Sequence, residues 1–486
     1  MERFISRVIG ITSRTRFFVA VVGVAMVAVV ATPQVATSQV VRMTVGPNGS
    51  FATIQGAVND CASGLNCQID VQGSNTYPEY IWIPSSFAVG NMTINGGWNS
   101  TFTLRDDDPN TTIIDGGAAD EVVHVQISGG SVTLDGFTIM NGSSLAGAGI
   151  TIVPQGDCTV KLTNLIIRNN HASFTGSLPG GGVWASLQGS SHLEVSRCRI
   201  VSNTATASSV NGNVAGAGLT ITASGAASYL VEDSWVEENT ASSAAGLEQG
   251  AGHFFGVSED ASAEIVNLRV ANNIASGTGS SVAGVGGTLY LTGNGQMTVR
   301  QSSWALNNAL SGESGEQLRI FCSDNASLLI TDSAVALGEQ NGLDGFAADT
   351  SELRLVNLTV ADNTLTGIDL TISGSATVDL HNSIAFGNGT DAFLQTGVGT
   401  GNNLIGVDPL FVDPGAPNYN YRLGEGSPGV DAGNNAPPGG LGSVDLDGRA
   451  RIENGTVDIG CYEGEGMLFY NGFESGGSGE WSATVG

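Results

Sequence analysis

An asparagine recurs at regular intervals along this chain, and each copy is preceded by the same pattern of residues. The copies are Asn170, Asn203, Asn239, Asn273, Asn307, Asn363 and Asn388. A degenerate copy at Gly338 fits the same register, and the successive spacings are 33, 36, 34, 34, 31, 25 and 25. Apolar residues stand ten, eight and three positions before each asparagine, and a polar residue stands six before it. Such a period is typical of a solenoid, in which units that cannot bury their apolar faces alone stack into one core.

The pattern within one repeat predicts short β-strands. The apolar residues at positions −10 and −8 give the two-residue alternation of a strand with one buried face. The change of spacing before position −3 indicates a corner, and even the shortest repeats have room for three short strands and three corners. We therefore predict an all-β fold, a right-handed parallel β-helix of roughly 11 coils that is about 50 Å long. The asparagines should form an amide ladder, and glycines should supply the positive φ angles of the corners.

The register makes predictions about the core and about the longer repeats. Val231 and Ile265 share position −8, so they should be buried and stacked in neighbouring coils. The longer repeats carry inserts between the asparagine and a glycine-rich step. These inserts comprise residues 172–179, 205–215, 241–249 and 275–283. Because they all leave the same corner, we expect them to form one wall along the solenoid that is peripheral to the core.

Residues 1–38 predict an export signal. Several arginines precede an apolar run over residues 17–31, and small residues precede Gln39 as at a cleavage site. A membrane anchor is the alternative, although the apolar run is short for a bilayer. We therefore expect an exported protein, extracellular or on a bacterial cell surface, where disulfides are permitted. Cys61 and Cys67 should form one across a short polar loop. The remaining cysteines should be buried free thiols: Cys158, Cys198, Cys322 and Cys461.

The rest of the chain divides into four segments. Residues 39–90 should form an N-terminal cap, with a short helix over residues 53–62 that covers the first coils. The predicted β-helix repeats occupy residues 91–412. A closing segment follows over residues 413–465, and a glycine-rich tail over residues 466–486 ends the chain.

The charge of the chain excludes one class of function. There are 45 acidic and 17 basic residues, which gives a formal net charge of −28. A nucleic-acid binder needs a cationic surface that neutralises phosphates, and this chain has none in its sequence. The 70 glycines disfavour a helical protein. No second long apolar segment follows the export signal, so we expect a mature chain without a transmembrane segment, and a monomer.

Several motifs resemble a known group of proteins over roughly residues 48–463. The stretches FATIQGAV, TINGGW, TIIDGG and VTLDGFTIMNG are similar to the beginning of extracellular right-handed β-helix proteins with a choice-of-anchor Q domain. The ending VDPLFVDP, GEGSPGVDAGNN and VDLDGRARIENGTVDIGCYE is similar to the end of the same proteins. The glycine steps and the aliphatic-x-x-Asn steps also resemble polymorphic outer-membrane-protein repeats, with Ile, Val or Trp in place of Phe. The resemblance implies a β-helix and a surface location, and it implies no established chemistry.

Two groups of residues are candidates for ligand binding. Asp445 and Asp447 begin like a calcium loop, and with Asp458 they would supply carboxylates for that ion. The later ligands of such a loop are absent from the sequence. The alternative is therefore that Asp447 or Asp458 forms an ion pair with Arg449 or Arg451 and fixes the final coil. No other cofactor is expected.

The second group is aromatic. Trp184, Phe254 and Tyr290 follow glycine steps in three coils, and Thr220 stands at the corresponding place in a coil between them. Exposed aromatic rings spaced along a solenoid can stack on sugars, and exposed apolar patches often mark binding surfaces. The alternative is that these rings pack against the inserts.

These observations predict a non-catalytic binding or structural protein that contacts a polysaccharide or another cell-surface component. The alternative is a polysaccharide lyase or glycoside hydrolase, since β-helices also carry such enzymes. An enzyme would need acidic and basic residues clustered on one face of neighbouring coils. The inserts are rich in Ser, Ala and Gly and contain few carboxylates, which favours binding.

Overall fold

The computed structural model describes residues 40–61, 65–85, 90–174, 180–207, 214–243, 248–276, 282–310 and 315–464. The predicted export signal, the C-terminal tail and parts of the four inserts lie outside these residues. Within the described part of the chain, no helix is long and apolar enough to cross a bilayer.

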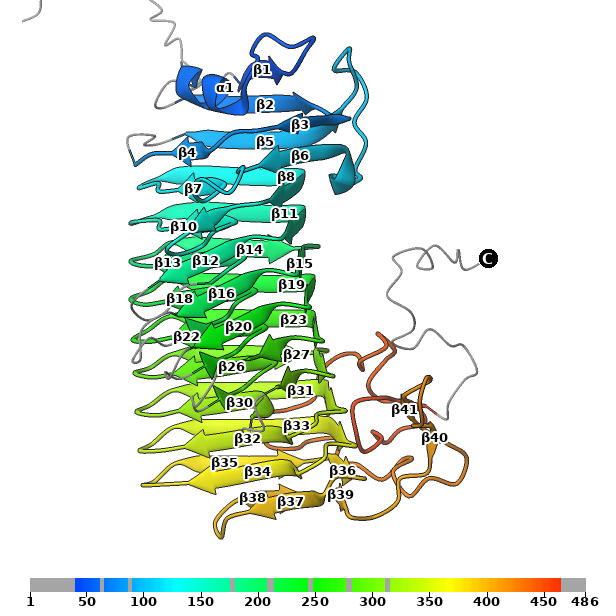
Figure 1. Ribbon diagram of the computed structural model, residues 1–486. Helices are drawn as coiled ribbons and strands as arrows, with labels where there is room; N and C mark the ends of the chain where they lie inside the picture. The colour runs from blue at the N-terminus through cyan, green and yellow to red at the C-terminus, as the bar shows by residue number, and fades with distance from the viewer. Residues whose placement is uncertain are drawn as a thin grey trace, which may run out of the picture. The chain divides into compact units, whose positions relative to one another are not determined.

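Parallel strands stack coil upon coil along the chain (Figure 1). The largest sheet has 19 strands. Its bounds are β1 (Val40–Val45), β2 (Asn66–Gln72), β3 (Asn75–Tyr77), β5 (Asn91–Trp98), β6 (Thr112–Asp115), β8 (Gly130–Met140), β11 (Cys158–Arg168), β14 (His192–Ser196), β15 (Arg199–Val201), β19 (Ser228–Glu237), β23 (Ser262–Ala271), β27 (Gln296–Arg300), β28 (Ser303–Ala305), β31 (Ser327–Ala336), β33 (Glu352–Ala361), β35 (Thr377–His381), β36 (Ile384–Phe386), β38 (Gly399–Gly401) and β39 (Leu404–Ile405). Each strand pairs with its counterpart one coil away, as in a parallel β-helix.

A second parallel sheet of 11 strands closes the other side of the core. Its bounds are β4 (Ile81–Ile83), β7 (Val123–Val125), β10 (Ile150–Ile152), β13 (Val183–Leu187), β18 (Leu219–Ala223), β22 (His253–Val257), β26 (Gly287–Leu291), β30 (Glu316–Cys322), β32 (Asn341–Ala347), β34 (Thr366–Ile372) and β37 (Thr390–Leu394). It contributes one strand to each of eleven coils, which agrees with the predicted number. The expected all-β parallel β-helix is thus confirmed.

The apolar register predicted from the repeat is the core of the fold. Val231 and Ile265 are fully buried and lie directly opposite each other on β19 and β23. The residues at positions −10, −8 and −3 of the other full repeats are also buried. Each coil therefore places the same positions inside, and their side chains stack along the solenoid.

The recurring asparagines form the expected ladder. The Nδ2 of Asn203 donates to the Oδ1 of Asn239 at 3.0 Å, and the Nδ2 of Asn239 donates to the Oδ1 of Asn273 at the same distance. Asn307 has no asparagine in the next coil, and there its Nδ2 donates to the Oε1 of Gln317 at 2.8 Å. The ladder thus continues through a residue that the asparagine register does not include.

Glycine supplies the positive φ angle at some corners, as predicted, for example at Gly189, Gly225 and Gly293, whereas the corner at position −6 differs from the prediction. At the polar position −6 the φ angles lie between 47° and 54° although no glycine is present. The residues are Asn164, Arg197, Asp233, Asn267, Gln301, Asp332, Asn357 and Asn382. Asparagine and aspartate tolerate this left-handed conformation because their short side chains form local hydrogen bonds. Polarity at position −6 therefore marks the corner.

The inserts, together with the corresponding corners of the neighbouring coils, contain strands of their own. Six short strands form a third sheet: β9 (Ser143–Ser144), β12 (His171–Phe174), β16 (Thr204–Ala207), β20 (Thr240–Ser243), β24 (Ile274–Ala275) and β29 (Asn308–Ala309). Three more form a fourth: β17 (Val214–Ala215), β21 (Glu248–Gln249) and β25 (Val282–Ala283). Buried alanines, among them Ala205, Ala207 and Ala241, pack there in a second small core. The predicted wall exists in the described part of the inserts, and it is packed more closely than a peripheral loop.

The N-terminal end of the solenoid carries the predicted cap. Helix α1 (Ile54–Asp60) begins at Thr53, whose side chain accepts a hydrogen bond from the Gly56 amide, and it packs against β1, β2 and β4. The disulfide between Cys61 and Cys67 joins the end of α1 to β2, as predicted. A 3-10 helix (Pro109–Thr111) lies on the connection to β6.

The closing segment turns back along the side of the coils. It begins with the antiparallel pair β40 (Phe411–Asp413) and β41 (Asn420–Leu423), two residues before the predicted boundary, and it lies beside β31, β33 and β36 (Figure 1). The Nε2 of Gln301 donates to the carbonyl of Asp445 at 3.0 Å, and the amide of Cys461 donates to the hydroxyl of Thr359 at 3.1 Å. Residues far apart in the sequence are therefore in direct contact.

Candidate functional site

The outward face of the 11-stranded sheet presents side chains in columns. Alternate residues of a strand point to opposite faces, and in-register parallel pairing aligns outward residues of successive coils. One column runs through Thr288, Arg319, Asp344 and Asp369, and a second runs through Tyr290, Phe321 and Phe346. We call Arg319, Asp344 and Asp369 the charged column, and Tyr290, Phe321 and Phe346 the aromatic column.

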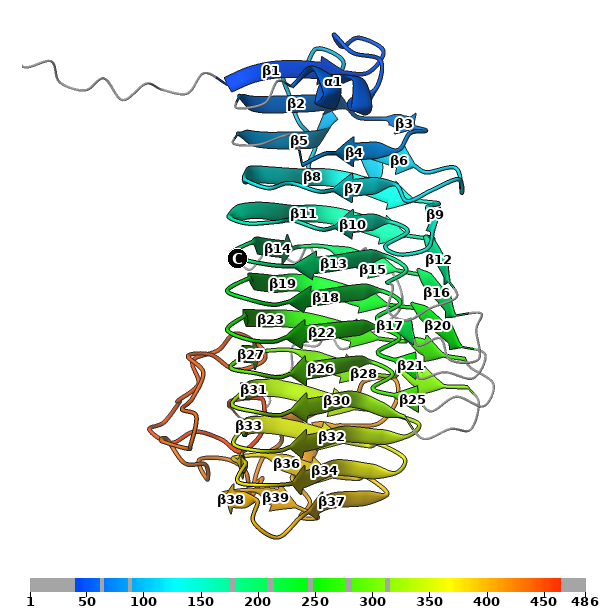
Figure 2. The same cartoon turned by 90° about the vertical axis from the view of Figure 1, so that its left-hand side faces the viewer.

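The inserts cover the first of these columns in the preceding coils. Thr220 and Thr288 point outward but are only 1% exposed. The hydroxyl of Thr220 donates to the carbonyl of Ala215 in β17 at 2.5 Å, which shows that the wall lies against this face. Figure 2 shows β17, β21 and β25 beside β18, β22 and β26, whereas β32 and β34 have no such neighbours. The column therefore becomes accessible from Arg319 onward.

Oppositely charged groups meet at the start of the charged column. The Nη1 of Arg319 lies 3.9 Å from the Oδ2 of Asp344 and 3.9 Å from the Oε1 of Glu316. The Oε2 of Glu316 accepts a hydrogen bond from the Gly284 amide at 2.8 Å. The Oδ1 of Asp369 is buried and has no hydrogen-bond partner among the described residues. Three coils thus place one guanidinium and three carboxyl groups on one face.

Burial raises the pKa values of these carboxyl groups. For Glu316 it raises the pKa to about 7, against the opposing effects of the Gly284 amide and Arg319. Burial raises the pKa of Asp344 against the opposing effect of Arg319, and Asp369 adds a smaller increase. Burial also raises the pKa of Asp369. With a pKa near 7, the Glu316 carboxyl group can donate as well as accept hydrogen bonds near neutral pH.

The rings of the aromatic column stack on one another. The centroids of Tyr290 and Phe321 are 4.9 Å apart with an interplanar angle of 8°, and those of Phe321 and Phe346 are 5.5 Å apart. Phe254 adjoins Tyr290 with a centroid distance of 6.3 Å. Because each ring covers the face of its neighbour, the column offers ring edges and the Tyr290 hydroxyl to a ligand. Stacking of a sugar on a free ring face is not available at the covered positions.

The structure separates the three aromatic residues that the sequence suggested as one stripe. Tyr290 is 38% exposed and belongs to the candidate site. Phe254 is only 6% exposed, since it is packed rather than presented to solvent, which corrects its assignment as a surface platform. Trp184 is half-buried and lies in the same column as Thr220 and Phe254, one column away from Tyr290.

The charged column was missed although the sequence carries a sign of it. Asp344 and Asp369 each follow a glycine and an aliphatic residue, in the stretches NGLDG and TGIDL. Their separation equals the step between Asn363 and Asn388, which is the length of one short coil. An acidic residue repeated at the coil length indicates a carboxylate pair on one face of the solenoid.

The three aspartates suggested as calcium ligands have other partners. Asp445 accepts hydrogen bonds from the backbone amides of Asp447, Arg449 and Glu463. Asp458 accepts from the amides of two other residues of the closing segment. Within the described residues, no group of three or more His, Cys, Asp and Glu side chains is arranged to hold a metal ion.

The ion pairs expected with Arg449 or Arg451 as the alternative also differ in their partners. Asp447 forms a bidentate pair with Arg422, with both N–O distances at 2.6 Å. Arg451 is 2% exposed and lies 3.4 Å from both Asp332 and Glu463. These charges hold the closing segment against the solenoid.

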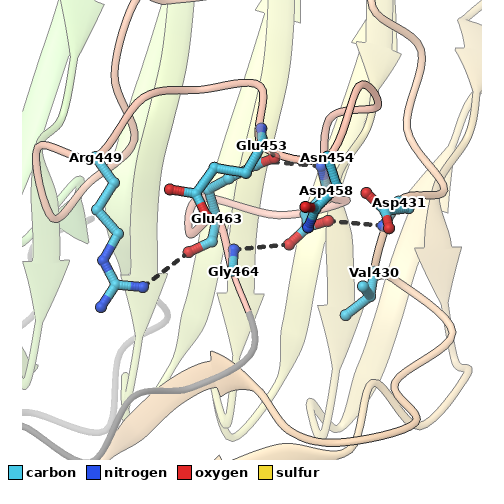
Figure 3. Close-up of a pocket in the computed structure, with 8 residues that line it drawn as sticks. All are labelled: Val430, Asp431, Arg449, Glu453, Asn454, Asp458, Glu463 and Gly464. Atoms are coloured by element: carbon cyan, nitrogen blue, oxygen red, sulfur yellow. Dashed lines mark hydrogen bonds between the residues drawn. The ribbon is translucent and has the colours of Figure 1, made fainter.

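A pocket of about 480 Å³ lies within the closing segment (Figure 3). Asp458 and Glu463 line it, and burial raises the pKa of Glu463 to about 7. Glu463 accepts hydrogen bonds from the amides of Glu453 and Asp458, and Arg449 donates to the Glu463 carbonyl at 3.2 Å. The carboxylates of Asp458 and Glu463 thus bind backbone amides of the same segment, which makes the charged column the better candidate.

The four remaining cysteines are buried free thiols, as predicted. Burial raises the pKa of Cys198 and of Cys461 to about 12, and that of Cys322 to about 11. A thiol with such a pKa is a poor nucleophile at neutral pH.

Comparison with known proteins leaves the chemistry open. No family model matches the chain, and no curated protein matches it. The structure is similar to that of a pectate lyase, Pel9A, with 11% identity and a TM-score of 0.46 over 88% of this chain and 97% of that chain. It is also similar to pectin methylesterase from Aspergillus niger, with 15% identity and a TM-score of 0.27 over 62% of this chain and 79% of that chain. Similarities of this size do not bear on the activity of the present chain.

Proposed function

We propose that this chain is an exported β-helix protein that binds polysaccharide on the outward face of β26, β30, β32 and β34. The observation that carries the proposal is the charged column beside the aromatic column in successive coils. Export is supported by the Cys61–Cys67 disulfide, since disulfides persist in oxidising compartments.

The two columns suit the two kinds of surface on a sugar. Carboxyl and guanidinium groups form strong hydrogen bonds with hydroxyl groups, and the Arg319 Nη1 lies 3.9 Å from its carboxylate neighbours Glu316 and Asp344, which is too far for a hydrogen bond. The exposed ring edges and the hydroxyl of Tyr290 offer apolar contact together with a further hydrogen bond. Because coils repeat about every 4.8 Å, an extended polymer along the solenoid would meet similar groups in each coil.

Cleavage of the polysaccharide is the second candidate function, and one observation favours it. Asp344 and Asp369 are directly opposite each other on β32 and β34, and burial raises the pKa of both. Glycoside hydrolysis uses a pair of carboxyl groups, one of which is held protonated as the acid. Arg319 adds a cation beside the pair.

Retention in affinity electrophoresis through gels containing single polysaccharides tests the binding proposal. Neutral, anionic and amino-sugar polymers should be compared, with and without calcium. Asp369→Asn and Tyr290→Phe should each weaken retention on the bound polymer about tenfold, because they alter hydrogen-bonding groups and preserve shape. Trp82→Ala is the matched control, since Trp82 is 46% exposed on β4 of the same sheet. Trp184→Ala should likewise leave retention unchanged.

Retention that is equal in Asp369→Asn, Tyr290→Phe and the unmodified chain would remove this face as the binding site. A parallel assay should measure reducing ends and unsaturated products released from each polymer. Loss of release in Asp344→Asn with retention preserved would establish the hydrolase or lyase function. If the unmodified chain releases no reducing ends or unsaturated products from any polymer that it binds, binding without cleavage is the function.

A further inference from the structure

The end of the coil stack that lies after β34 presents unpaired strand edges. Strand β37 pairs with β34 on one side, and β38 pairs with β35. In the described part of the chain, no strand pairs with their other edges. Figure 1 shows β37 and β38 at the lower end of the stack, with the closing segment beside the coils rather than beneath them.

The two ends of the solenoid are treated differently. At the N-terminal end, α1 buries Ile54, Ala57 and Val58 against the first coils. At the other end, the inward residues Ala392 and Leu394 are only partly buried, and Phe393 is 54% exposed. The last coil therefore leaves apolar surface and backbone hydrogen-bonding groups open to solvent.

The sequence of the last coil has little of the usual protection of a free edge. Natural sheets guard exposed edges with charged residues, prolines or bulges, because unpaired edges recruit other strands. Strand β37 carries one charged residue, Asp391, whose Oδ1 accepts hydrogen bonds from the backbone amide and the Nδ2 of Asn388. Residues 392–407 contain no Asp, Glu, Lys, Arg, His or Pro, although the whole chain carries 45 acidic and 17 basic residues. An edge without these features is typical of one that another strand covers.

We propose that a second copy of this chain covers the edge, so that two solenoids join end to end about a two-fold axis. In such a dimer β37 of one copy pairs antiparallel with β37 of the other. The same surface of each copy then supplies the hydrogen-bond partners of the other. The two Phe393 side chains approach across the axis and lose solvent exposure. This dimer would replace the monomer expected from the sequence.

Charge explains why the contact is between copies and at this end. Each copy carries a formal net charge of −28, so most of its surface repels a second copy. The stretch 392–407 is uncharged, and in an antiparallel pairing centred on Phe393 the Asp391 of one copy lies opposite Gln395 of the other, so two copies can meet there without placing carboxylates of the last coil opposite each other. The proposal is independent of polysaccharide binding.

Sedimentation velocity of the chain from Gln39 onward, at rising protein concentration, tests the dimer. We expect the dimer mass, and at least tenfold weaker association for Phe393→Lys, which places like charges opposite each other at the axis. The introduced ammonium group lies next to Asp369 in register, so the fold should tolerate it. Leu145→Lys is the matched control, because Leu145 is 73% exposed and lies far along the chain, between β9 and β10. It should dimerise like the unmodified chain.

Hydrogen exchange of the amides in residues 390–394 gives a second measurement that does not depend on a variant. In the proposed dimer, protection of these amides rises with protein concentration. A monomer at every concentration would overturn the proposal. So would a dimer that Phe393→Lys leaves intact, or protection at 390–394 that does not change with concentration, since another part of the same chain would then cover the edge.

Discussion

Glu316 shows how one residue at the candidate site makes stability depend on pH. Burial raises the pKa of its carboxyl group from 4.5 to about 7. Between these values the folded state holds a proton that the unfolded state has lost. The resulting stabilisation is fully present below pH 4.5 and is lost as the pH rises through 7.

Glu316→Gln should therefore remove the part of the pH dependence of folding stability that comes from this carboxyl group. A glutamine is neutral and can still accept the hydrogen bond from the Gly284 amide. Above pH 7, we expect the free energy of unfolding of the variant to exceed that of the unmodified chain by up to about 3 kcal/mol. Thermal unfolding followed by circular dichroism from about pH 5 to 8.5 measures this, with Glu425→Gln on the exposed surface as the control. Parallel curves for Glu316→Gln and the unmodified chain would contradict the assignment.

Some residue contacts in the core could not be predicted from the repeat. The Nε1 of Trp304 donates to the Nε2 of His253 at 2.9 Å, and His253 stacks on Phe255 with a centroid distance of 4.2 Å. Gly287 makes room for this ring, because a Cβ there would lie 2.0 Å from the His253 Nε2. Residues 253, 287 and 304 belong to different strands, and only the exact stacking of coils brings them together. Burial lowers the pKa of His253 to about 3, which keeps the ring neutral inside the core.

At the scale of the strand, alternation decides which substitutions the fold tolerates. Val231 on β19 points into the core of the solenoid. Its neighbour Leu230 points outward and is half-buried between Glu194 and Glu264. Val231→Asp places an unpaired charge in the apolar stack and should lower the free energy of unfolding by at least about 3 kcal/mol. Leu230→Arg, one position away, should change it by less than about 1 kcal/mol. Urea unfolding compares the two variants, and similar losses would show that the strand does not alternate as described.

Much of the architecture at this scale could be predicted from the sequence, because apolar and polar residues repeat in one register. The strands of the inserts could not, since alanine, serine and glycine carry little β-propensity. Those short strands form because Ala172, Ala205 and Ala241 stack in neighbouring coils and bury one another. The charged column was missed for a related reason. Asp344 and Asp369 lie outside the asparagine register. Their proximity becomes visible only when outward-facing residues one coil length apart are compared.

At the scale of the whole molecule, the closing segment is held by a buried arginine. The Nη2 of Arg451 donates to the carbonyls of Asp458 and Gly460, and the same side chain faces the carboxylates of Asp332 and Glu463. Arg451→Met leaves two buried carboxylates without their cation, which typically costs about 3–5 kcal/mol. We expect faster hydrogen exchange and proteolysis in residues 429–464, with the strand signal in circular dichroism retained. Asp332→Asn added to Arg451→Met should restore part of the loss. Unchanged proteolysis would show that apolar packing alone holds the segment.

The sequence resemblance marked this segment as an ending, but its position could not be deduced from the repeat. It contacts much earlier coils through hydrogen bonds with Asn382, Thr359 and Gln301. Its acidic residues looked like metal ligands because the sequence does not show which backbone amides they accept from. The carboxylates of Asp445 and Asp458 fold the segment by binding those amides.

The lateral return of the closing segment gives the molecule an order of assembly. Coils that contact only their neighbours can be added one after another onto the end covered by α1, as in other repeat proteins. The segment has no surface to bind until the coils that contain Gln301, Asp332 and Thr359 exist. Synthesis from the N-terminus therefore first produces a stack of coils whose last coil is unprotected and can unfold locally. The closing segment is made last, and it connects the late coils to earlier ones. A nascent chain cut short before residue 429 would hold most of its strands but would lack the contacts of the closing segment with Gln301, Asp332 and Thr359.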